Sequence, residues 1–402
     1  MTRRHCARVV FVALGALSLL GCRTTTAALE CERTAALRCP GDEAPAPSTS
    51  ATDQPRSDAS TSTAASAPAP LPAAPDPERP AMILDIREPS PSVPNAFVMV
   101  HGDRYLLFAT EARDASGTKV NVPVSESRDL VNWTFLGDAM PTVGAWAVPE
   151  ATWAPDVLSI GDRWVLYYTG RVGGVVPDTQ CIGAAVSDEP TGPYAPLDEP
   201  IVCQLDRRGS IDPRHFVDAA GVRWLHWKSD DNADVDGTTT ATIHAARLDA
   251  TGTALASNPT PILEVSQPWE GRIVEAPDMV ADPDGRLWLF YSGNWFNQAA
   301  YALGVARCDT PAGPCHKPFD GPWLASNAQG AGPGEAALFE GRDGTLRIVY
   351  SPVAQDFDDL TSVRPVALGA LDFDATGPYL VDPAAAPDLL RDGALPAVGR
   401  AP

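Results

Sequence analysis

The chain has 402 residues and a formal net charge of −21 at pH 7. Residues 1–80 hold 8 basic and 8 acidic side chains, so the whole negative excess lies in residues 81–402. A field of this sign repels polyphosphate, which excludes nucleic-acid binding and adhesion to an anionic membrane through a basic face. Residues 81–402 are long enough to bury a sizeable core, and neutral or cationic ligands remain open to them.

The N-terminal residues have the pattern of an export signal. A basic start precedes the apolar run Val9–Leu20, which is shorter than the roughly 20 residues of a membrane span. The Leu-Leu-Gly before Cys22 resembles a bacterial lipobox. We predict a lipoprotein signal peptide over 1–21 and a lipid anchor on Cys22. Arg23, which follows the anchor, favours sorting to the outer membrane. The alternative is an ordinary signal peptide with a chance cysteine.

The segment after the signal has the composition of a linker. Its part Pro40–Pro80 contains 10 Pro, 10 Ala and 10 Ser or Thr, and it lacks aromatic residues. Such a sequence cannot bury enough apolar surface to offset its chain entropy. We therefore expect 22–80 to be a disordered tether that precedes one folded domain over 81–402.

Six cysteines remain once Cys6 leaves with the signal and Cys22 is acylated. An even number is typical of disulfides in an oxidising compartment. Proximity in the sequence predicts three pairs, and free buried thiols stay an alternative for the first of them. The pairs are Cys31 with Cys39, Cys181 with Cys203, and Cys308 with Cys315.

Five similar units follow one another in the folded part. Each has a glycine that opens a run rich in aromatic and β-branched residues, which is typical of a hairpin and its second strand. The glycines are Gly102, Gly161, Gly221, Gly285 and Gly344, at spacings of 59 to 64 residues. An apolar strand precedes each glycine. Without a helical period, this pattern predicts an all-β fold, a five-bladed β-propeller; the alternatives are a pair of β-sandwiches or a β-helix, which needs a shorter repeat.

Polar residues stand at the start of each predicted inner strand, and four of the five blades supply a carboxylate. They are Asn95, Asp156, Asp212, Glu275 and Glu335. In a propeller the inner strands line the central channel, so these side chains should gather at one mouth. Mutual repulsion raises the pKa of clustered carboxyl groups. A protonated and an ionised carboxyl group together are what glycoside hydrolysis requires.

The motifs at these positions resemble those of glycoside hydrolase family 43. They are Ser127–Trp133, Trp153–Val157, Ile211–Pro213, Trp269–Gly271, Val274–Pro277 and Phe290–Asn294. The resemblance covers about residues 92–379, and it implies a five-bladed propeller that cleaves arabinose- and xylose-containing polysaccharides with inversion. With Cys181–Gly183 and Gly313–Cys315, the chain is most similar to members that remove α-L-arabinofuranosyl units.

The resemblance also implies roles for single residues. Glu275 corresponds to the general acid, and Asp212 to the aspartate that raises the pKa of that acid and orients it. The alternative for Asp212 is an Asx-turn before a proline. Trp146 and Trp153 are candidates for sugar-facing walls, or for core between blades. Asp156 is a candidate for binding substrate hydroxyls, or for capping its strand.

The sequence departs from the family pattern at the base. Asn95 stands where the resemblance places the aspartate that takes a proton from water, and an amide has no useful basicity. Loss of general-base help costs about a hundredfold to ten-thousandfold in rate. A replacement base would be another carboxylate, and the candidates are Asp85, Glu88, Asp156 and Glu335.

A second departure concerns a metal. Many relatives have a histidine after the aromatic residue that corresponds to Tyr350, and it helps hold calcium or sodium. Here Ser351 takes that place. We expect no required cofactor, and the substitution puts a structural calcium in doubt.

These features predict an exported, monomeric glycosidase acting on terminal arabinofuranosidic or xylosidic linkages. The main alternative is a carbohydrate-binding propeller that lost turnover through Asn95. A sialidase-like propeller would need an Asp-box, and Ser127–Trp133 lacks one residue and a glycine of that motif. A purely structural propeller would not need Asp212 and Glu275 on one channel.

Overall fold

The computed structural model describes residues 81–174, 179–233, 237–327, 330–353 and 363–382. The predicted signal peptide, Cys22, the tether and the Cys31–Cys39 pair lie outside these residues. Within the described part, no helix has the length and apolar character needed to cross a bilayer.

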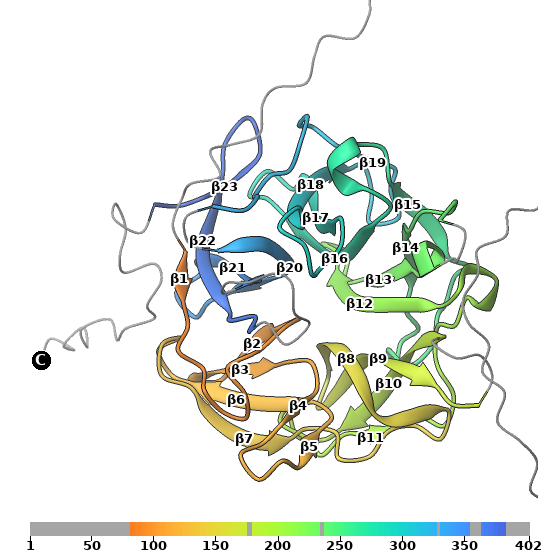
Figure 1. Ribbon diagram of the computed structural model, residues 1–402, viewed down its shortest axis with the longest axis vertical. Coiled ribbons are helices and arrows are strands. Elements are labelled where there is room, and N and C mark those ends of the chain that lie inside the picture. Colours follow the sequence, from red (N-terminus) through yellow and green to blue (C-terminus); the bar gives the residue numbers. More distant parts are fainter. Residues whose placement is uncertain (1–80, 175–178, 234–236, 328–329, 354–362, 383–402) are drawn as a thin grey trace, which may run out of the picture. The chain divides into compact units, whose positions relative to one another are not determined.

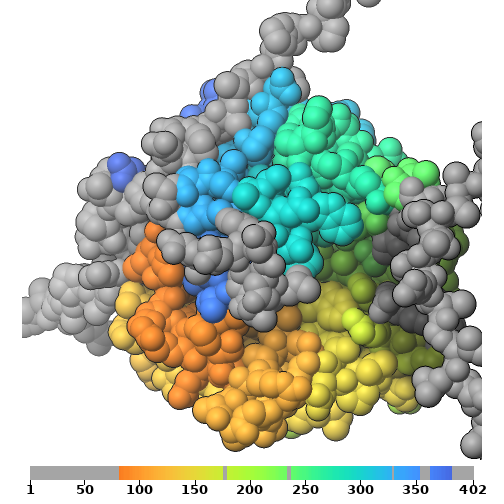
Figure 2. All heavy atoms as spheres, viewed as in Figure 1, coloured from red at the N-terminus to blue at the C-terminus, as the bar shows by residue number. Residues whose placement is uncertain are grey.

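Five antiparallel sheets stand around a common axis, and they follow one another in chain order (Figures 1 and 2). The predicted five-bladed propeller is confirmed. Blade 1 contains β2 (Phe97–His101), β3 (Arg104–Phe108), β6 (Pro123–Ser127) and β7 (Thr134–Asp138); blade 2 contains β8 (Ala147–Ile160), β9 (Arg163–Val172), β10 (Gln180–Ser187) and β11 (Ala195–Pro196). Blade 3 contains β12 (Ser210–Val217), β13 (Arg223–Ser229), β14 (Thr242–Arg247) and β15 (Thr260–Glu264).

Blade 4 contains β16 (Val274–Ala281), β17 (Leu287–Gly293), β18 (Ala302–Cys308) and β19 (Cys315–His316); blade 5 contains β20 (Ala331–Glu340), β21 (Leu346–Val353), β22 (Ala367–Phe373) and β23 (Pro378–Leu380). A two-stranded sheet, β4 (Ala112–Arg113) with β5 (Lys119–Val120), and three 3-10 helices, Leu205–Arg207, Asp231–Ala233 and Pro268–Glu270, complete the described elements.

Each repeated glycine lies in the turn between the inner strand of a blade and its second strand. At Gly102 and Gly161 φ is +61° and +63°, a backbone conformation that residues with a Cβ rarely adopt. An added Cβ would meet no atom within 4 Å at either glycine. The turn therefore requires glycine for its conformation and not for lack of space.

The ring of blades is closed by the start of the domain. Strand β1 (Met82–Ile83) pairs antiparallel with β22 of blade 5, with Met82 opposite Leu368. The five inner strands β2, β8, β12, β16 and β20 each contact the two beside them. The axis is therefore lined by residues from all five blades.

The core is divided into five hydrophobic clusters, one between each pair of neighbouring blades. Successive side chains of a strand point to opposite faces. In β3, Leu106 packs against blade 2 and Leu107 against blade 5, and both are almost fully buried. Strands buried on both faces explain the continuous apolar runs that follow each repeated glycine.

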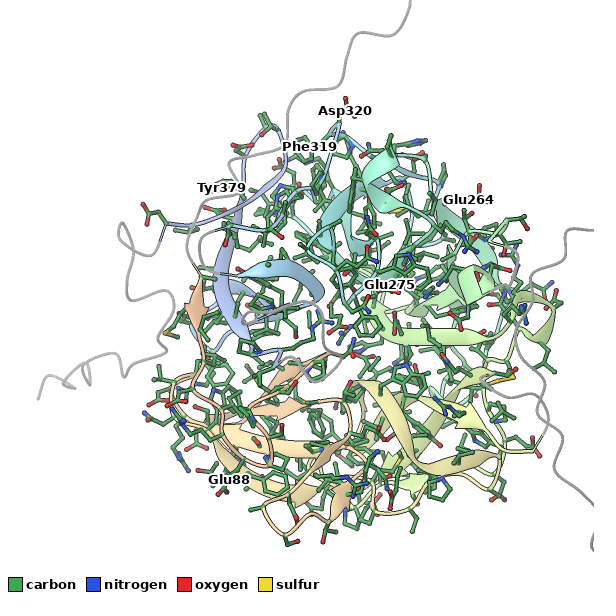
Figure 3. The ribbon with its side chains drawn as sticks, in the orientation of Figure 1. Glu88, Glu264, Glu275, Phe319, Asp320 and Tyr379 are labelled. Carbon is green, nitrogen blue, oxygen red and sulfur yellow. A yellow bond between two sulfur atoms is a disulfide. The ribbon has the colours of Figure 1, made fainter. Side chains whose placement is uncertain are left out.

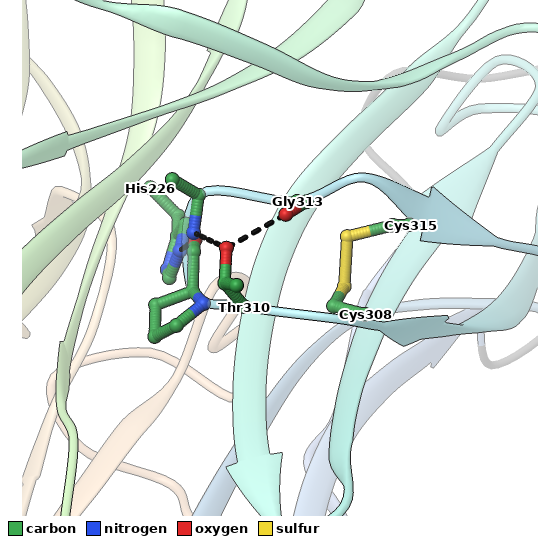
Figure 4. Close-up of a disulfide and its surroundings, with 7 residues drawn as sticks. His226, Cys308, Thr310, Gly313 and Cys315 are labelled. Carbon is green, nitrogen blue, oxygen red and sulfur yellow. Dashed lines mark hydrogen bonds between the residues drawn. A yellow bond between two sulfur atoms is a disulfide. The ribbon is translucent and has the colours of Figure 1, made fainter.

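Two of the predicted disulfides are confirmed. Cys181 joins Cys203 in blade 2, and Cys308 joins Cys315 between β18 and β19 (Figure 4). Disulfides of this kind are typical of exported proteins.

Candidate active site

Five residues at the starts of the inner strands surround the axis, and we name them the first ring. They are Asn95, Ala154, Asp212, Ala276 and Glu335, and each has a left-handed φ between +47° and +58°. In β8, β12, β16 and β20 the register shifts at this point, as at a β-bulge. All five line one small cavity, with Arg214 and two prolines. Of the five residues predicted to gather at one channel mouth, Asn95, Asp212 and Glu335 line this cavity, whereas Asp156 and Glu275 do not.

Three backbone N–H groups of the first ring are bound by hydroxyls of the preceding blade. The acceptors are Thr110 for Ala154 (3.3 Å), Thr169 for Asp212 (3.1 Å) and Ser292 for Glu335 (2.9 Å). Thr169 and Ser292 lie on second strands, opposite the residue that precedes the ring position of their own blade. A hydroxyl therefore ties blades 1, 2 and 4 to the blade that follows each of them.

At the two other ring positions, the acceptor of the backbone N–H is a carboxylate oxygen and not a hydroxyl. The Ala276 N–H donates to Asp212 Oδ2, and the Asn95 N–H donates to Glu335 Oε2, both at 3.0 Å. Asp212 therefore bonds to the next blade and not to its own turn, which contradicts the Asx-turn alternative. All five ring amides have partners.

Lys228 explains why blade 3 lacks the hydroxyl. It occupies on β13 the place that Thr169 has on β9, opposite Ile211, and it is 2% exposed. Its Nζ donates to Glu275 Oε2 at 3.0 Å and lies 3.3 Å from Asp230 Oδ1. Burial alone would lower the pKa of Lys228, but the charges of Glu275 and Asp230 outweigh it and raise the pKa. Lys228 is thus a fixed cation beside Glu275.

Glu275 and Asp212 lie together on neighbouring inner strands, as the sequence predicts. Glu275 is 9% exposed, near the centre of the ring of blades (Figure 3), and its Oε1 accepts a hydrogen bond from the Tyr301 hydroxyl at 2.7 Å. Burial, and next the charge of Glu275, raise the pKa of Asp212 to about 7. Asp212 can therefore carry a proton near neutral pH.

Glu335 is the second carboxylate of the first ring. Its Oε1 accepts a hydrogen bond from Arg364 at 2.9 Å, and the same guanidinium donates to the Ser351 carbonyl oxygen at 2.9 Å. Burial raises the pKa of Glu335, while Arg364 opposes the rise. Among the candidate bases, Glu335 shares the cavity with Asn95.

The other candidate bases lie elsewhere. Asp85 is exposed and paired with Arg87 at 2.8 Å. Glu88 lies at the outer edge of blade 1, far from Glu275 (Figure 3). Asp156 is fully buried. None of these three side chains lines the cavity.

A second ring lies two residues further along the inner strands. It comprises Phe97, Asp156, Arg214, Asp278 and Ala337. Arg214 lies between Asp156 and Asp278, at 3.4 Å from each, and over the Phe97 ring. Asp156 also accepts hydrogen bonds from the backbone N–H of His215 at 2.8 Å and from its ring at 2.7 Å. Substrate binding by Asp156 is therefore wrong, because its oxygens are buried and bonded within the protein.

The predicted sugar-facing tryptophans have different environments. Trp146 is stacked on Tyr168 in the core between blades 1 and 2, in a slot that Gly170 and Gly183 leave open. A sugar wall at Trp146 is therefore wrong, and the core alternative is right. Trp153 is half-buried beside Ala154, in the place on β8 that Glu275 has on β16.

Sequence analysis missed two aromatic residues and two cations of this region. Trp295 and Phe296 follow β17 and are 38% and 45% exposed. Arg364 lies 5.9 Å from the Phe296 ring and 5.5 Å from the Tyr301 ring. The available signal was the Trp-Phe pair directly after the Phe290–Asn294 motif. Lys228 and Arg364 come from outside the inner strands.

The surroundings of Ser351 do not fit a metal site. The Ser351 hydroxyl lies 3.5 Å from the Val93 carbonyl oxygen, and its own carbonyl oxygen accepts from Arg364. The Arg364 guanidinium therefore binds the Ser351 carbonyl oxygen, and oxygen is the kind of ligand that a calcium ion takes. Within the described ranges, no group of three or more His, Cys, Asp or Glu side chains could hold a metal.

Residues 84–377, which are most of the chain, match the family described as "Glycosyl hydrolases family 43". The chain belongs to this family. It is 37% identical over 81 residues to xylosidase/arabinosidase 43A of Humicola insolens, covering 20% of this chain and 22% of that protein. It is 27% identical over 259 residues to an extracellular endo-alpha-(1->5)-L-arabinanase of Thermotoga petrophila, covering 54% and 49%. The chain thus spans between a fifth and a half of these curated relatives.

Solved structures share the fold. A thermostable family-43 glycoside hydrolase aligns with a TM-score of 0.62 at 23% identity, covering 72% of this chain and 92% of that one. An alpha-L-arabinofuranosidase from Lactobacillus brevis aligns with a TM-score of 0.58 at 17% identity, covering 71% and 92%. At these identities the structures support the fold alone.

Proposed function

We propose that this protein hydrolyses terminal arabinofuranosidic or xylosidic bonds of pentose-containing glycans, with inversion. The observation that carries the proposal is the geometry of Asp212, which lines the axial cavity and accepts the backbone N–H of the residue after Glu275. The printed activities of the relatives, a xylosidase/arabinosidase and an arabinanase, support the choice of pentose linkages.

Glu275 is the general acid in this proposal. Lys228 holds Oε2, so the atom that delivers the proton to the leaving oxygen is Oε1, which contacts Tyr301 in the free protein. Asp212 orients the strand that carries Glu275, through the Ala276 N–H. These roles need no metal.

Exposed aromatic residues supply the surface against which a sugar ring stacks. The Phe296 ring lies beside Arg364, which contacts Glu335 and the Tyr301 ring, and Trp295 precedes Phe296 in the chain. Aromatic faces pack well against the apolar faces of a sugar ring. We assign them, with Trp153, to substrate binding.

We further propose that the protein works as a monomer outside the cytoplasm, tethered by a lipid on Cys22. The two disulfides support export to an oxidising compartment. The apolar run, small residue and Cys22 in register support the anchor.

The experiment compares Glu275→Gln with the wild type on aryl α-L-arabinofuranosides and β-D-xylosides, with the product anomer followed by NMR. We expect inversion, and a loss of about 10² to 10⁴ in kcat for a poor leaving group. The loss should shrink for a phenol of low pKa, because that leaving group needs no proton. Glu264→Gln, an exposed change at the outer edge (Figure 3), is the control. An equal loss for all leaving groups would contradict the acid role.

A sugar-binding propeller is the second candidate, and Asn95 favours it because an amide cannot take a proton from water. Calorimetry with arabino-oligosaccharides separates the two. Binding without release of sugar, together with a gain of activity in Asn95→Asp, would support the binding function.

A further inference from the structure

The orientation of Asn95 limits what it offers to a water molecule. The Thr110 hydroxyl accepts the Ala154 N–H, so its own proton goes to Asn95 Oδ1, at 2.9 Å. The amide oxygen accepts this bond, and the NH2 group can donate a hydrogen bond to a water molecule. Asn95 can therefore hold a water by donating to it, but it cannot accept the proton of that water.

Glu335 lies directly beside Asn95 in the first ring. Its Oε2 accepts the Asn95 N–H at 3.0 Å, its φ of +58° falls at a shift in strand register, and 8% of the residue is exposed, within the cavity lining. Each carboxylate oxygen has two lone pairs. Both oxygens of Glu335 can therefore accept a water proton beside their present bonds.

Among the described residues that line the cavity, Asp212 and Glu335 carry carboxylates. Asp212 lies on the side of the acid, because it accepts the N–H of the residue after Glu275. Glu335 instead accepts the backbone N–H of Asn95, the residue that would hold the water. The ring thus separates an acid side from a water side.

The charge around Glu335 suits proton transfer. Burial, and the nearby Glu275 charge, raise the pKa of Glu335, while Arg364 and the Asn95 N–H oppose that rise. A carboxylate that is ionised yet more basic than usual is what general-base catalysis at neutral pH needs. Arg364 also fixes the side chain, through one bond to Glu335 and one to the Ser351 carbonyl oxygen.

We infer that Glu335, from blade 5, is the general base of this protein, in place of the aspartate that Asn95 replaces. The inference rests on the proposed hydrolase function. A water held beside Asn95 forms a bond from its oxygen to the anomeric carbon, and its proton goes to Glu335. The bond from that carbon to the leaving oxygen breaks, and this oxygen takes the proton of Glu275. Both carboxyl groups then return to their starting states by exchange with solvent.

The test uses two changes at Glu335 in the full chain. Glu335→Gln keeps an oxygen to accept the Asn95 N–H but removes the base, so kcat should fall about 10² to 10⁴ fold in the folded variant. Glu335→Ala leaves room for a small anion, and azide or formate should restore turnover. With azide the product should be the glycosyl azide of inverted configuration. Glu340→Gln, an exposed change at the far end of β20, is the control.

A third variant adds Asn95→Asp to Glu335→Gln, and it should regain part of the lost rate. A wild type that inverts, with Glu335→Gln equally active, overturns the base assignment and leaves the hydrolase proposal standing. Loss of activity that neither anions nor Asn95→Asp restore assigns Glu335 a structural role and also overturns it. A wild type that releases no sugar from any pentoside defeats the hydrolase proposal first, and this inference with it.

Discussion

The two rings on the axis use the same strands and similar residues, yet they differ in how their charges are balanced. In the second ring Arg214 lies between two aspartates that are 0% and 4% exposed, and His215 adds further bonds to Asp156. Burial alone would raise the pKa of Asp156, but the charges and bonds of His215 and Arg214 lower it. The charged side chains of the second ring are therefore buried and paired with one another.

The first ring leaves its acids less fully paired. Asp212 and Glu335 are 7% and 8% exposed, and both have raised pKa values. Their cations, Lys228 and Arg364, come from a second strand and from a segment before β22, and not from the ring itself. The two rings therefore differ in where the cation stands: Arg214 lies within the second ring, between Asp156 and Asp278, whereas Arg364 reaches Glu335 from outside the first ring.

Removing the cation of the second ring should have the largest effect on stability. Arg214→Leu leaves Asp156 and Asp278 buried without their common partner, and the free energy of unfolding should fall by about 3 to 5 kcal/mol. Urea unfolding would measure it. Because burial raises the pKa of Asp278 to about 6 even with Arg214 present, protonation should soften the loss at pH 5 relative to pH 8.

The matched control is Arg163→Leu, which breaks the exposed pair with Asp188. Surface pairs contribute little. If Arg214→Leu lowered the free energy of unfolding no more than this control does, the ion pairs of the second ring would not stabilise the fold.

The first ring should also lose stability as the pH rises, because the pKa of Asp212 is raised. Asp212 ionises near pH 4 in the unfolded chain but near pH 7 in the folded one. Between these values the unfolded state binds fewer protons, so stability falls as pH rises. Asp212→Asn keeps an acceptor for the Ala276 N–H and removes this fall. The variant should be more stable than wild type at pH 8, by at most about 4 kcal/mol, and equally stable below pH 4.

Urea unfolding at pH 4, 6 and 8 would measure this difference, and assays should show lost turnover in the same variant. A variant that is less stable than wild type at pH 8 would show that Asp212 stabilises the fold, as the second-ring acids do.

The sequence was sufficient for the fold because each blade repeats a local signal. A turn glycine such as Gly161 must adopt a left-handed φ, and the run after it is buried on both faces, so both features survive in every copy. Asp212 and Glu275 could be predicted for a similar reason, since the start of an inner strand has one place in a propeller. The disulfides followed from proximity along the chain.

Contacts between blades could not be predicted in the same way. The role of Lys228 depends on the register of β13 against β12 and on the neighbouring blade, which single-strand patterns do not contain. Trp146 was misplaced because the slot that holds it is formed by glycines from two other strands. A comparison of second strands across blades would have helped, since a lysine stands there among Thr169, Ser292 and Ser351.

The smallest predicted effect concerns the hydroxyls between blades. Thr169→Val leaves the Asp212 N–H without its acceptor, which should cost about 1 to 3 kcal/mol of stability and several-fold in kcat through misplacement of the carboxylate. Thr152→Val is the matched control, because Thr152 is equally buried in the same blade and bonds the Asn121 carbonyl oxygen instead. Both variants should lose similar stability in urea, and Thr169→Val alone should lose turnover. Equal losses of turnover would mean that the hydroxyl supports the blade as a whole, and that Asp212 keeps its position without it.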